Sequence, residues 1–108
     1  MIYTVTLNPS IDYHIKLDSI KVGAINRSSQ ERCFAGGKGI NVSIMLNRLG
    51  MKSIATGFVC GFTGSYIEHL VQCEGVSTDF VHLDTGTSRI NVKIAGAEET
   101  EINGAGPL

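Results

Sequence analysis

The hydrophobic positions along the chain follow two patterns, and each pattern predicts a different kind of β-strand. Three short runs are apolar or β-branched almost throughout, as strands covered on both faces are: residues 2–7, 53–59 and 79–83. Other stretches alternate apolar with polar side chains, which is typical of a strand with one face in water: residues 13–17 and 89–95, with 24–28 and 99–103 as further candidates. We expect residues 99–103 to pair with 89–95 across a turn.

Two stretches show the spacing of an amphipathic helix. The first follows a glycine-rich loop and ends at Gly50, and its expected core face consists of Val42, Met45, Leu46 and Leu49. The second is expected to open with a capping box of Ser65 and Glu68 and to end near Gly75. Its expected core face consists of Ile67, Leu70 and Val71.

The order of these elements predicts an α/β fold. Strands of the first kind alternate with the helices, which indicates a mostly parallel central sheet. The alternating strands cannot belong to that buried sheet, so they predict a second, small, half-exposed sheet that acts as a lid or a pairing surface. On this interpretation residues 1–108 are one portion of a single domain, with lid strands at approximately 12–28 and 88–103 inserted between core elements.

Composition and charge exclude several classes of protein. Hydrophobic residues make up 43% and charged residues 18%, which fits a globular chain and not a disordered one. A net charge of −1 without a basic block argues against a nucleic-acid or membrane partner, and the apolar runs are too short to cross a membrane. Three cysteines without a Cys-x-x-Cys pair favour reduced thiols over disulfides or a metal site. With no sign of a signal peptide at the N-terminus, we expect a cytoplasmic protein without a metal site in this segment.

The glycine-rich segment 35–41, Ala-Gly-Gly-Lys-Gly-Ile-Asn, leads directly into the first predicted helix. Glycines allow the backbone to approach a ligand, and the first N–H groups of a helix favour anions and hydroxyls. The segment is not a Walker A loop, because Gly39 stands where that motif needs Ser or Thr, and no dinucleotide fingerprint is present. A plain strand-to-helix turn is the alternative, but such a turn does not require three glycines and a lysine in four positions. We interpret the loop as a ligand site.

Two charged residues outside the loop are candidates for the same site. Asp12 follows the first buried strand, and ligands of open α/β sheets gather at the carboxyl ends of strands. Its carboxylate could accept hydrogen bonds from sugar-like hydroxyls or could simply cap a turn. Arg89 could bind a phosphate through two N–H groups or could belong to an ordinary solvated strand face. Arg27 has a weaker claim of the same kind.

Three motifs resemble, in the same order, the N-terminal part of the PfkB-type sugar kinases of the ribokinase superfamily. They are residues 6–12 (Thr-Leu-Asn-Pro-Ser-Ile-Asp), 36–42 (Gly-Gly-Lys-Gly-Ile-Asn-Val) and 88–92 (Ser-Arg-Ile-Asn-Val). The resemblance covers essentially the whole chain and is strongest to the branch that phosphorylates sugar phosphates. It implies a ribokinase-like α/β sandwich with a small β-sheet lid, and this lid often forms the contact of a homodimer.

The resemblance also implies roles for individual residues. Asp12 and Asn41 would bind sugar hydroxyls, with the backbone of Gly36 and Gly37 beside them. Cations near the substrate phosphate would be Lys38 and Arg89, with Arg27 as a tentative third. The expected substrate is a phosphorylated ketohexose: fructose 1-phosphate, converted with ATP to fructose 1,6-bisphosphate and ADP, or alternatively tagatose 6-phosphate.

No catalytic residue is expected in this segment. In the family, the resemblance implies a catalytic aspartate in a Gly-Ala-Gly-Asp motif, together with the ATP and Mg²⁺ sites, at positions beyond Leu108. Residues 104–107, Gly-Ala-Gly-Pro, look similar to that motif, but proline cannot accept a proton and the segment follows a lid strand. The 108 residues alone are therefore expected to bind no ATP and to be inactive. A short, non-catalytic protein that binds a sugar phosphate or dimerises through the lid strands remains the alternative of another class.

Overall fold

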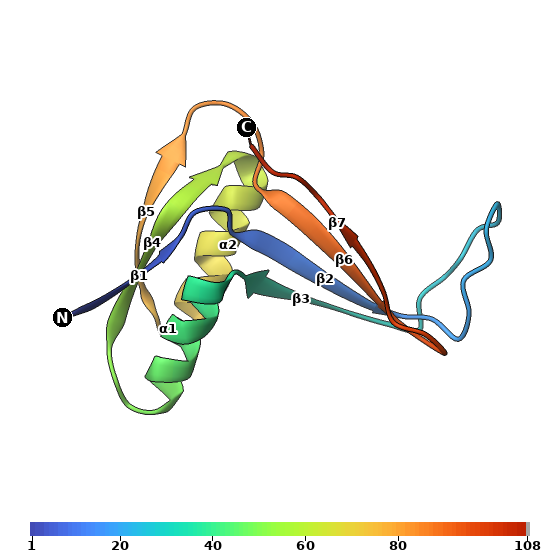
Figure 1. Ribbon diagram of the computed structural model, residues 1–108, viewed down its shortest axis with the longest axis horizontal. Coiled ribbons are helices and arrows are strands. Elements are labelled where there is room, and N and C mark those ends of the chain that lie inside the picture. The colour runs from blue at the N-terminus through green and yellow to red at the C-terminus, as the bar shows by residue number, and fades with distance from the viewer. Residues whose placement is uncertain (108) are drawn as a thin grey trace.

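The structure is a computed structural model that describes residues 1–107 of the chain. Its elements in chain order are β1 (Ile2–Thr6), β2 (Ser10–Lys16), β3 (Gln30–Gly36), α1 (Lys38–Arg48), β4 (Ser53–Cys60), α2 (Gly61–Cys73), β5 (Ser77–Leu83), β6 (Arg89–Ala95) and β7 (Thr100–Asn103). They form two sheets (Figure 1). The first is parallel, with the strand order β1-β4-β5, and the second has the order β3-β2-β6-β7.

The second sheet, called the lid below, includes strands from both predicted lid segments, but its strand β3 lies outside the predicted bounds of 12–28 and 88–103. Its inner strands β2 and β6 run parallel to each other, and β3 and β7 pair with them in antiparallel fashion at the two edges. The lid extends away from the helices, and the connection between β2 and β3 projects beyond its far end (Figure 1). Two sheets of different character were expected from the two hydrophobic patterns, and this expectation is confirmed.

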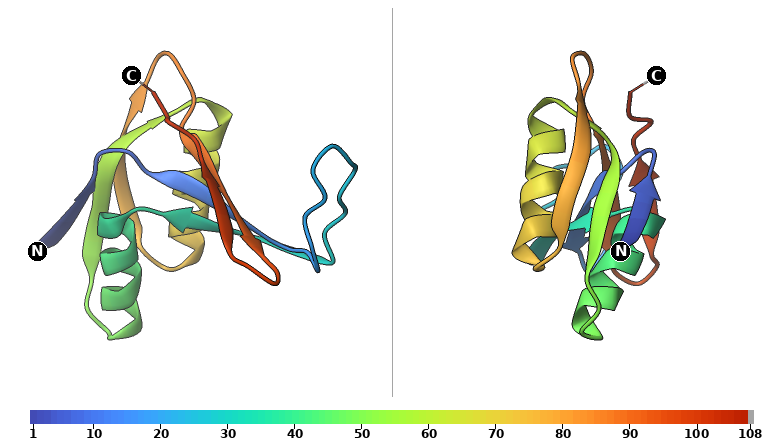
Figure 2. Two further views of the ribbon diagram at one scale, coloured as in Figure 1. Left: turned by 45° about the vertical axis from the view of Figure 1, so that its right-hand side comes forward. Right: turned by 90° about the vertical axis from the view of Figure 1, so that its left-hand side faces the viewer.

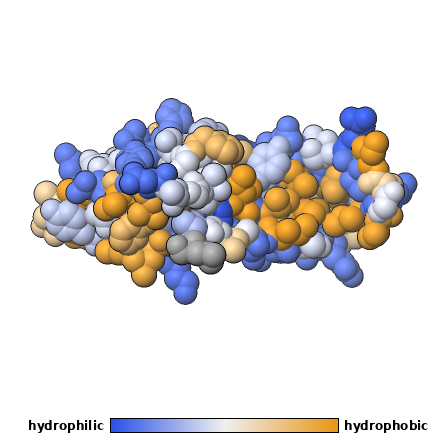
Figure 3. All heavy atoms as spheres, turned by 90° about the horizontal axis from the view of Figure 1, so that it is seen from above, coloured by the Kyte–Doolittle hydropathy of each residue, from blue (hydrophilic) through white to orange (hydrophobic). Residues whose placement is uncertain are grey.

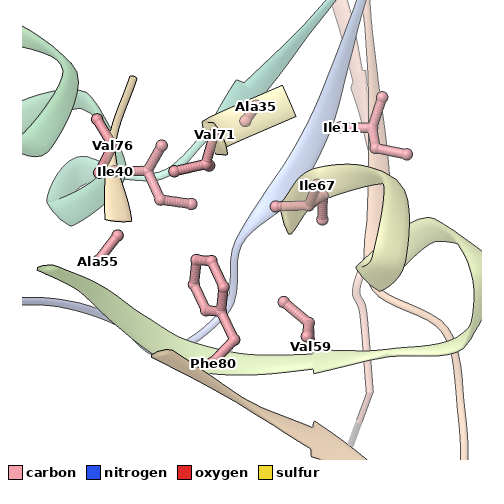
Figure 4. Packing of buried hydrophobic residues seen from close by; sticks show 9 residues of the cluster. All are labelled: Ile11, Ala35, Ile40, Ala55, Val59, Ile67, Val71, Val76 and Phe80. Atoms are coloured by element: carbon pink, nitrogen blue, oxygen red, sulfur yellow. The ribbon is translucent and has the colours of Figure 1, made fainter. Parts of the chain in front are cut away.

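The helices join the two sheets. Helix α1 contacts β1 and β4, whereas α2 contacts β4 and β5 on one side and β2 and β3 of the lid on the other (Figure 2). The buried apolar cluster lies around α2 and draws on both sheets, as Figure 4 shows. It consists of Ile11, Ala35, Ile40, Ala55, Val59, Ile67, Val71, Val76 and Phe80. The core face expected for α2 is confirmed, since Ile67 and Val71 are fully buried and Leu70 packs against the cluster.

The parallel sheet is covered on one face only. The prediction that residues 2–7 form a buried central strand is wrong, because β1 lies at the edge of the sheet and exposes alternate side chains. Tyr3 is 60% and Val5 62% exposed, and Phe58 and Val81 on the neighbouring strands are exposed on the same face. Parallel strands are normally covered on both faces. Within the described residues this face is bare, so the apolar sequence of β1 predicts more burial than the strand has.

The core face predicted for the first helix is also wrong. Val42, Met45 and Leu49 are half or more exposed, whereas Ile40 and Ser43 are fully buried. The serine can be buried because its hydroxyl is hydrogen-bonded to two others, 2.6 Å from Thr4 Oγ1 and 2.8 Å from Ser53 Oγ. A buried polar group that is hydrogen-bonded carries little penalty, so hydrophobicity alone identified the wrong face. The predicted C-terminal cap is confirmed: Gly50 follows the helix with φ 83°.

Two other expectations are corrected. No strand forms at residues 24–28; the strand in this region is β3, at Gln30–Gly36, and it leads directly into the glycine-rich loop. Strand β3 carries charged side chains on its exposed part, so it lacks a clear alternating signal. Helix α2 begins at Gly61, four residues before Ser65, so no capping box opens it. The positions of β6 and β7 and their antiparallel pairing are as expected.

Candidate functional site

The glycine-rich loop is a tight connection from β3 to the start of α1. Gly37 immediately precedes the helix with φ 132°, a conformation that L side chains rarely adopt. A Cβ on Gly39 would lie 2.6 Å from Thr6 Oγ1 and 2.7 Å from the Val5 carbonyl oxygen, and one on Gly37 would meet Thr6 as well. The glycines therefore let the loop press against β1. In the sequence analysis the glycines are explained by the approach of a ligand, with a tight strand-to-helix turn as the alternative, and this packing is a reason for them that needs no ligand.

Thr6 holds the N-terminus of α1 in place. Its Oγ1 accepts a hydrogen bond of 3.0 Å from the Ile40 N–H group, and the first bond of the helix proper runs from the Asn41 N–H group to the Gly37 carbonyl. Among the described residues, no hydrogen bond uses the N–H groups of Lys38 and Gly39. These two donors lie at the positive end of the helix dipole, where anions are favoured.

Asp12 lies beside this loop with its carboxylate fixed on one side. Its Oδ1 accepts hydrogen bonds from Ser10 Oγ at 2.8 Å and from Asn91 Nδ2 at 3.2 Å. Ser10 is on the same strand, and Asn91 is opposite Asp12 in the β2–β6 pairing. Oδ2 is directed toward Gly36, since a Cβ added to that glycine would meet it. Within residues 1–107 the hydrogen bonds of this carboxylate involve Oδ1 only, so Oδ2 is left as an acceptor.

Asp12 and Asn41 line the same cleft, which has a volume of about 420 Å³. It lies between the β3 edge of the lid and the two helices. Its other lining residues are His14, Cys33, Phe34, Ala35, Ile44, Met45, Arg48, Leu70 and Glu74. The structure therefore brings together the two residues for which sugar-hydroxyl contacts were expected.

The two expected phosphate-binding cations lie close to this region but do not line the cleft. Lys38 is the first residue of α1 and is exposed. Arg89 begins β6 opposite Ser10, and its Nε donates a hydrogen bond of 3.1 Å to the Asn8 carbonyl oxygen. Neither cation takes part in an ion pair with another described residue. Both therefore keep their charge available for an anion.

A further cation, Lys93 on β6, is already paired with a carboxylate. Lys93 Nζ lies 2.6 Å from Glu101 Oε1 on the neighbouring strand β7. This hydrogen-bonded ion pair raises the pKa of Lys93 and lowers the pKa of Glu101. The charge of Lys93 is thus matched within the lid, in contrast to Lys38 and Arg89.

Arg27 does not join the other candidates. It lies in the connection between β2 and β3, and Lys16 and Gln30 at the far end of the lid separate it from Asp12 along the strands. Residues 18–29 of this connection are all exposed. Within one copy of the chain, the tentative assignment of Arg27 to the same site has no support from its position.

Three residues of the site escaped the sequence analysis as individual candidates: Thr6, Ser10 and Asn91. For Ser10 a signal existed, because residues two apart on a strand share a face and Ser10 precedes Asp12 by two. Asn91 belongs to the motif at residues 88–92, but its contact with Asp12 depends on strand pairing between residues 79 positions apart. The capping role of Thr6 likewise depends on a long-range contact.

The described residues contain no group of three or more His, Cys, Asp or Glu side chains placed to hold a metal ion. None of the helices in this part of the chain is both long and apolar enough to cross a membrane. The cysteines are unpaired: Cys60 is buried, Cys33 half-buried and Cys73 exposed. Residues 104–107 follow β7, and the Asn8 side chain donates to the Ala105 carbonyl at 3.1 Å, so this glycine-rich segment lies against the turn after β1.

A parallel sheet flanked by helices and joined to a second, small sheet is the architecture of the ribokinase-like carbohydrate kinases. Comparison with known families agrees: the PfkB family of carbohydrate kinases matches residues 5–107. The chain belongs to the PfkB carbohydrate kinase family.

Three relatives show which members of the family the chain resembles in sequence. The chain is 52% identical to 1-phosphofructokinase of Bacillus subtilis, 43% identical to D-tagatose-1-phosphate kinase of Bacillus licheniformis and 37% identical to tagatose-6-phosphate kinase of Staphylococcus epidermidis. These matches cover 99 to 100% of the chain but only 34 to 35% of each relative, so the chain spans about a third of their length.

Solved structures agree with this family membership. Two structures of phosphofructokinase-2 from Escherichia coli are each 28% identical to the chain. Each match covers 97% of this chain and 35% of the phosphofructokinase-2 chain. The TM-score is 0.87 for its complex with fructose-6-phosphate and 0.85 for its tetrameric inhibited form.

Proposed function

We propose that this chain is the sugar-phosphate-binding N-terminal part of an ATP-dependent sugar-phosphate kinase. The whole enzyme would transfer the γ-phosphoryl group of ATP to a free hydroxyl of fructose 1-phosphate and release fructose 1,6-bisphosphate and ADP. The single observation that carries this proposal is the Asp12 carboxylate, with Oδ1 held by the protein and Oδ2 free, in a cleft that also contains Asn41.

The chemistry of the site suits a phosphorylated sugar. A carboxylate oxygen and an amide can bind vicinal hydroxyls, and these are the groups that Asp12 and Asn41 offer. The phosphate would be bound by Lys38 and Arg89, whose charges no carboxylate of the described residues neutralises. The free N–H groups at the start of α1, with the backbone of Gly36 and Gly37 beside them, would contribute further donors.

The residues of this segment do not fit a magnesium–nucleotide group. The Gly36–Gly39 loop has no hydroxyl in the position where a Walker A loop holds magnesium, and no acidic cluster is available among the described residues. We therefore assign ATP, Mg²⁺ and the catalytic base of the proposed enzyme to sequence outside this segment. Phosphoryl transfer requires both partners to be positioned, so the 108 residues alone should bind the acceptor without phosphorylating it.

Fructose 1-phosphate is the preferred substrate because the two more similar of the three relatives described above are named for sugars phosphorylated at position 1. Tagatose 6-phosphate is the alternative, in line with the more distant relative. The experiment is a comparison of initial rates with ATP and each sugar phosphate, using the endogenous polypeptide that carries this segment. A higher kcat/KM for fructose 1-phosphate supports the proposal, and a preference for tagatose 6-phosphate replaces it by the alternative.

We further propose that the protein is a homodimer that pairs through the lid. One face of the lid carries apolar side chains, of which Ile90 and Ile102 are 43% and 61% exposed, and apolar residues gather over the lid half of the molecule in Figure 3. Exposed apolar patches of this kind mark interfaces. A cytoplasmic location is part of the proposal, because three free cysteines suit a reducing compartment.

The alternative from another class is a short protein that binds a sugar phosphate or dimerises without catalysis. The intact mass of the endogenous polypeptide, captured through this N-terminal sequence, separates the two. A mass about three times 11.6 kDa supports the kinase, in keeping with the length of the relatives. A mass of 11.6 kDa would leave only the binding or assembly function.

A further inference from the structure

We infer that Asn91 is a positioning residue for Asp12 and that it fixes which carboxylate oxygen receives the sugar hydroxyl. This inference rests on the proposed function and concerns the same site. Asn91 Nδ2 donates to Asp12 Oδ1 at 3.2 Å, and Ser10 Oγ donates to the same oxygen at 2.8 Å. Two donors on one oxygen leave Oδ2 as the acceptor that faces the ligand.

The burial of these donors limits the alternatives to their bonds with the carboxylate. Ser10 is 1% and Asn91 7% exposed, so neither can exchange its bond to the carboxylate for one to bulk water. They hold the carboxylate from two directions, Ser10 from within β2 and Asn91 from the neighbouring strand β6. A catalytic or binding group held by buried partners keeps its orientation before the ligand arrives.

The unpartnered half of the Asn91 amide indicates that the residue is not there for stability. Its Oδ1 is buried without a hydrogen-bond partner among the described residues. If the amide were rotated by about 180°, Asn91 Oδ1 would face the Asp12 carboxylate and the hydrogen bond would be lost. The bond to Asp12 therefore holds Asn91 in the orientation that leaves Oδ1 without a partner. A buried polar atom without a partner destabilises a protein, and an apolar residue of similar size would avoid that cost. We therefore attribute the presence of asparagine at this position to its effect on the orientation of Asp12.

The neighbouring strand supplies a matched control. Asn103 on β7 is directly opposite Asn91, but it is exposed and makes no hydrogen bond with Asp12. Replacing Asn103 changes the same residue type in the same row of the lid without touching the carboxylate.

The experiment measures the Kd for fructose 1-phosphate by calorimetry, and Tm by thermal unfolding, in the endogenous polypeptide and its variants. Asn91→Leu, with Asn91→Ala as a second variant, is expected to weaken binding about tenfold while Tm stays equal or rises. Asn103→Leu is expected to leave the Kd unchanged. In an Asp12→Ala background, Asn91→Leu should have no further effect on the Kd, because its role passes through Asp12.

The outcomes distinguish this inference from the function on which it rests. If the unmodified polypeptide binds fructose 1-phosphate but Asn91→Leu and Asn91→Ala bind it equally well, the positioning role is refuted and the proposed function stands. If both variants lose affinity only together with a large loss of Tm, Asn91 is a structural residue and the inference is also refuted. If the unmodified polypeptide does not bind fructose 1-phosphate, the proposed function fails and the inference fails with it.

Discussion

The close approach of Gly36 to Asp12 allows the geometry of the site to be tested by adding a single methyl group. In a Gly36→Ala variant the new Cβ would lie 2.6 Å from Ser10 Oγ and 2.7 Å from Asp12 Cγ, whereas ordinary van der Waals contact begins at 3.4 Å. Both side chains would have to move by about 0.7–0.8 Å. Overpacking of this kind costs about 1–3 kcal/mol of stability, and a displacement approaching 1 Å in a binding group can reduce activity by about 10²-fold.

Thermal unfolding and calorimetry with fructose 1-phosphate measure the two effects on the endogenous polypeptide. We expect Gly36→Ala to lower Tm by roughly 2–10 °C and to weaken ligand binding at least about tenfold. Gly64→Ala is the control for overpacking away from the site, since its Cβ would lie 2.9 Å from Val59 Cβ; it should lower Tm but leave the Kd unchanged. An Asp12→Ala background should recover part of the stability lost through Gly36→Ala. Unchanged affinity in Gly36→Ala would refute the placement of Asp12 beside the loop.

Three further expectations follow from the site and from the bare sheet face. Thr6→Val removes the hydroxyl that caps α1 and leaves the buried Ile40 N–H group without a partner, so it should lower the free energy of unfolding by about 1–3 kcal/mol in chemical denaturation; an unchanged midpoint would contradict the capping role. Lys38→Ala and Arg89→Ala should each raise KM for fructose 1-phosphate by about ten- to a hundredfold. They should hardly change the binding of unphosphorylated fructose, and an equal loss for both sugars would contradict a phosphate role. The isolated 108-residue chain should self-associate through the uncovered face of β1, β4 and β5, seen as a rising mass in light scattering with concentration, whereas a stable monomer with a sharp unfolding transition would contradict this.

The division into two sheets could be predicted from the sequence because the burial of a strand determines its pattern of apolar and polar residues. The alternation in β6 follows from one face in water, whereas the near-continuous apolar character of β4 is suited to a strand covered on both faces. The same logic explains the error for β1: its sequence is suited to a strand covered on both faces, whereas the described residues cover only one. In α1, Ser43 can be buried because it bonds to hydroxyl groups of β1 and β4. The hydrophobic periodicity of the helix contains no information about these partners.

The candidate site could be predicted only in part, for a related reason. Asp12 and Asn41 carry chemistry that local motifs reveal, and the structure places both on one cleft. The contact between Asn91 and Asp12 instead depends on the pairing register of β2 and β6, which the sequence does not specify over such a separation. For Arg27, the residue type suggested a phosphate contact, but its place in the projecting connection could not be known before the lid strands were located.

A crystal structure of the endogenous polypeptide with fructose 1-phosphate would test the central claim most directly. We predict a sugar hydroxyl within hydrogen-bond distance of Asp12 Oδ2, with Ser10 and Asn91 still bound to Oδ1, and the phosphate held by Lys38 and Arg89. A sugar phosphate bound elsewhere, or bound with its phosphate on the lid away from both cations, would contradict the assignment of this segment as the acceptor site of a sugar-phosphate kinase.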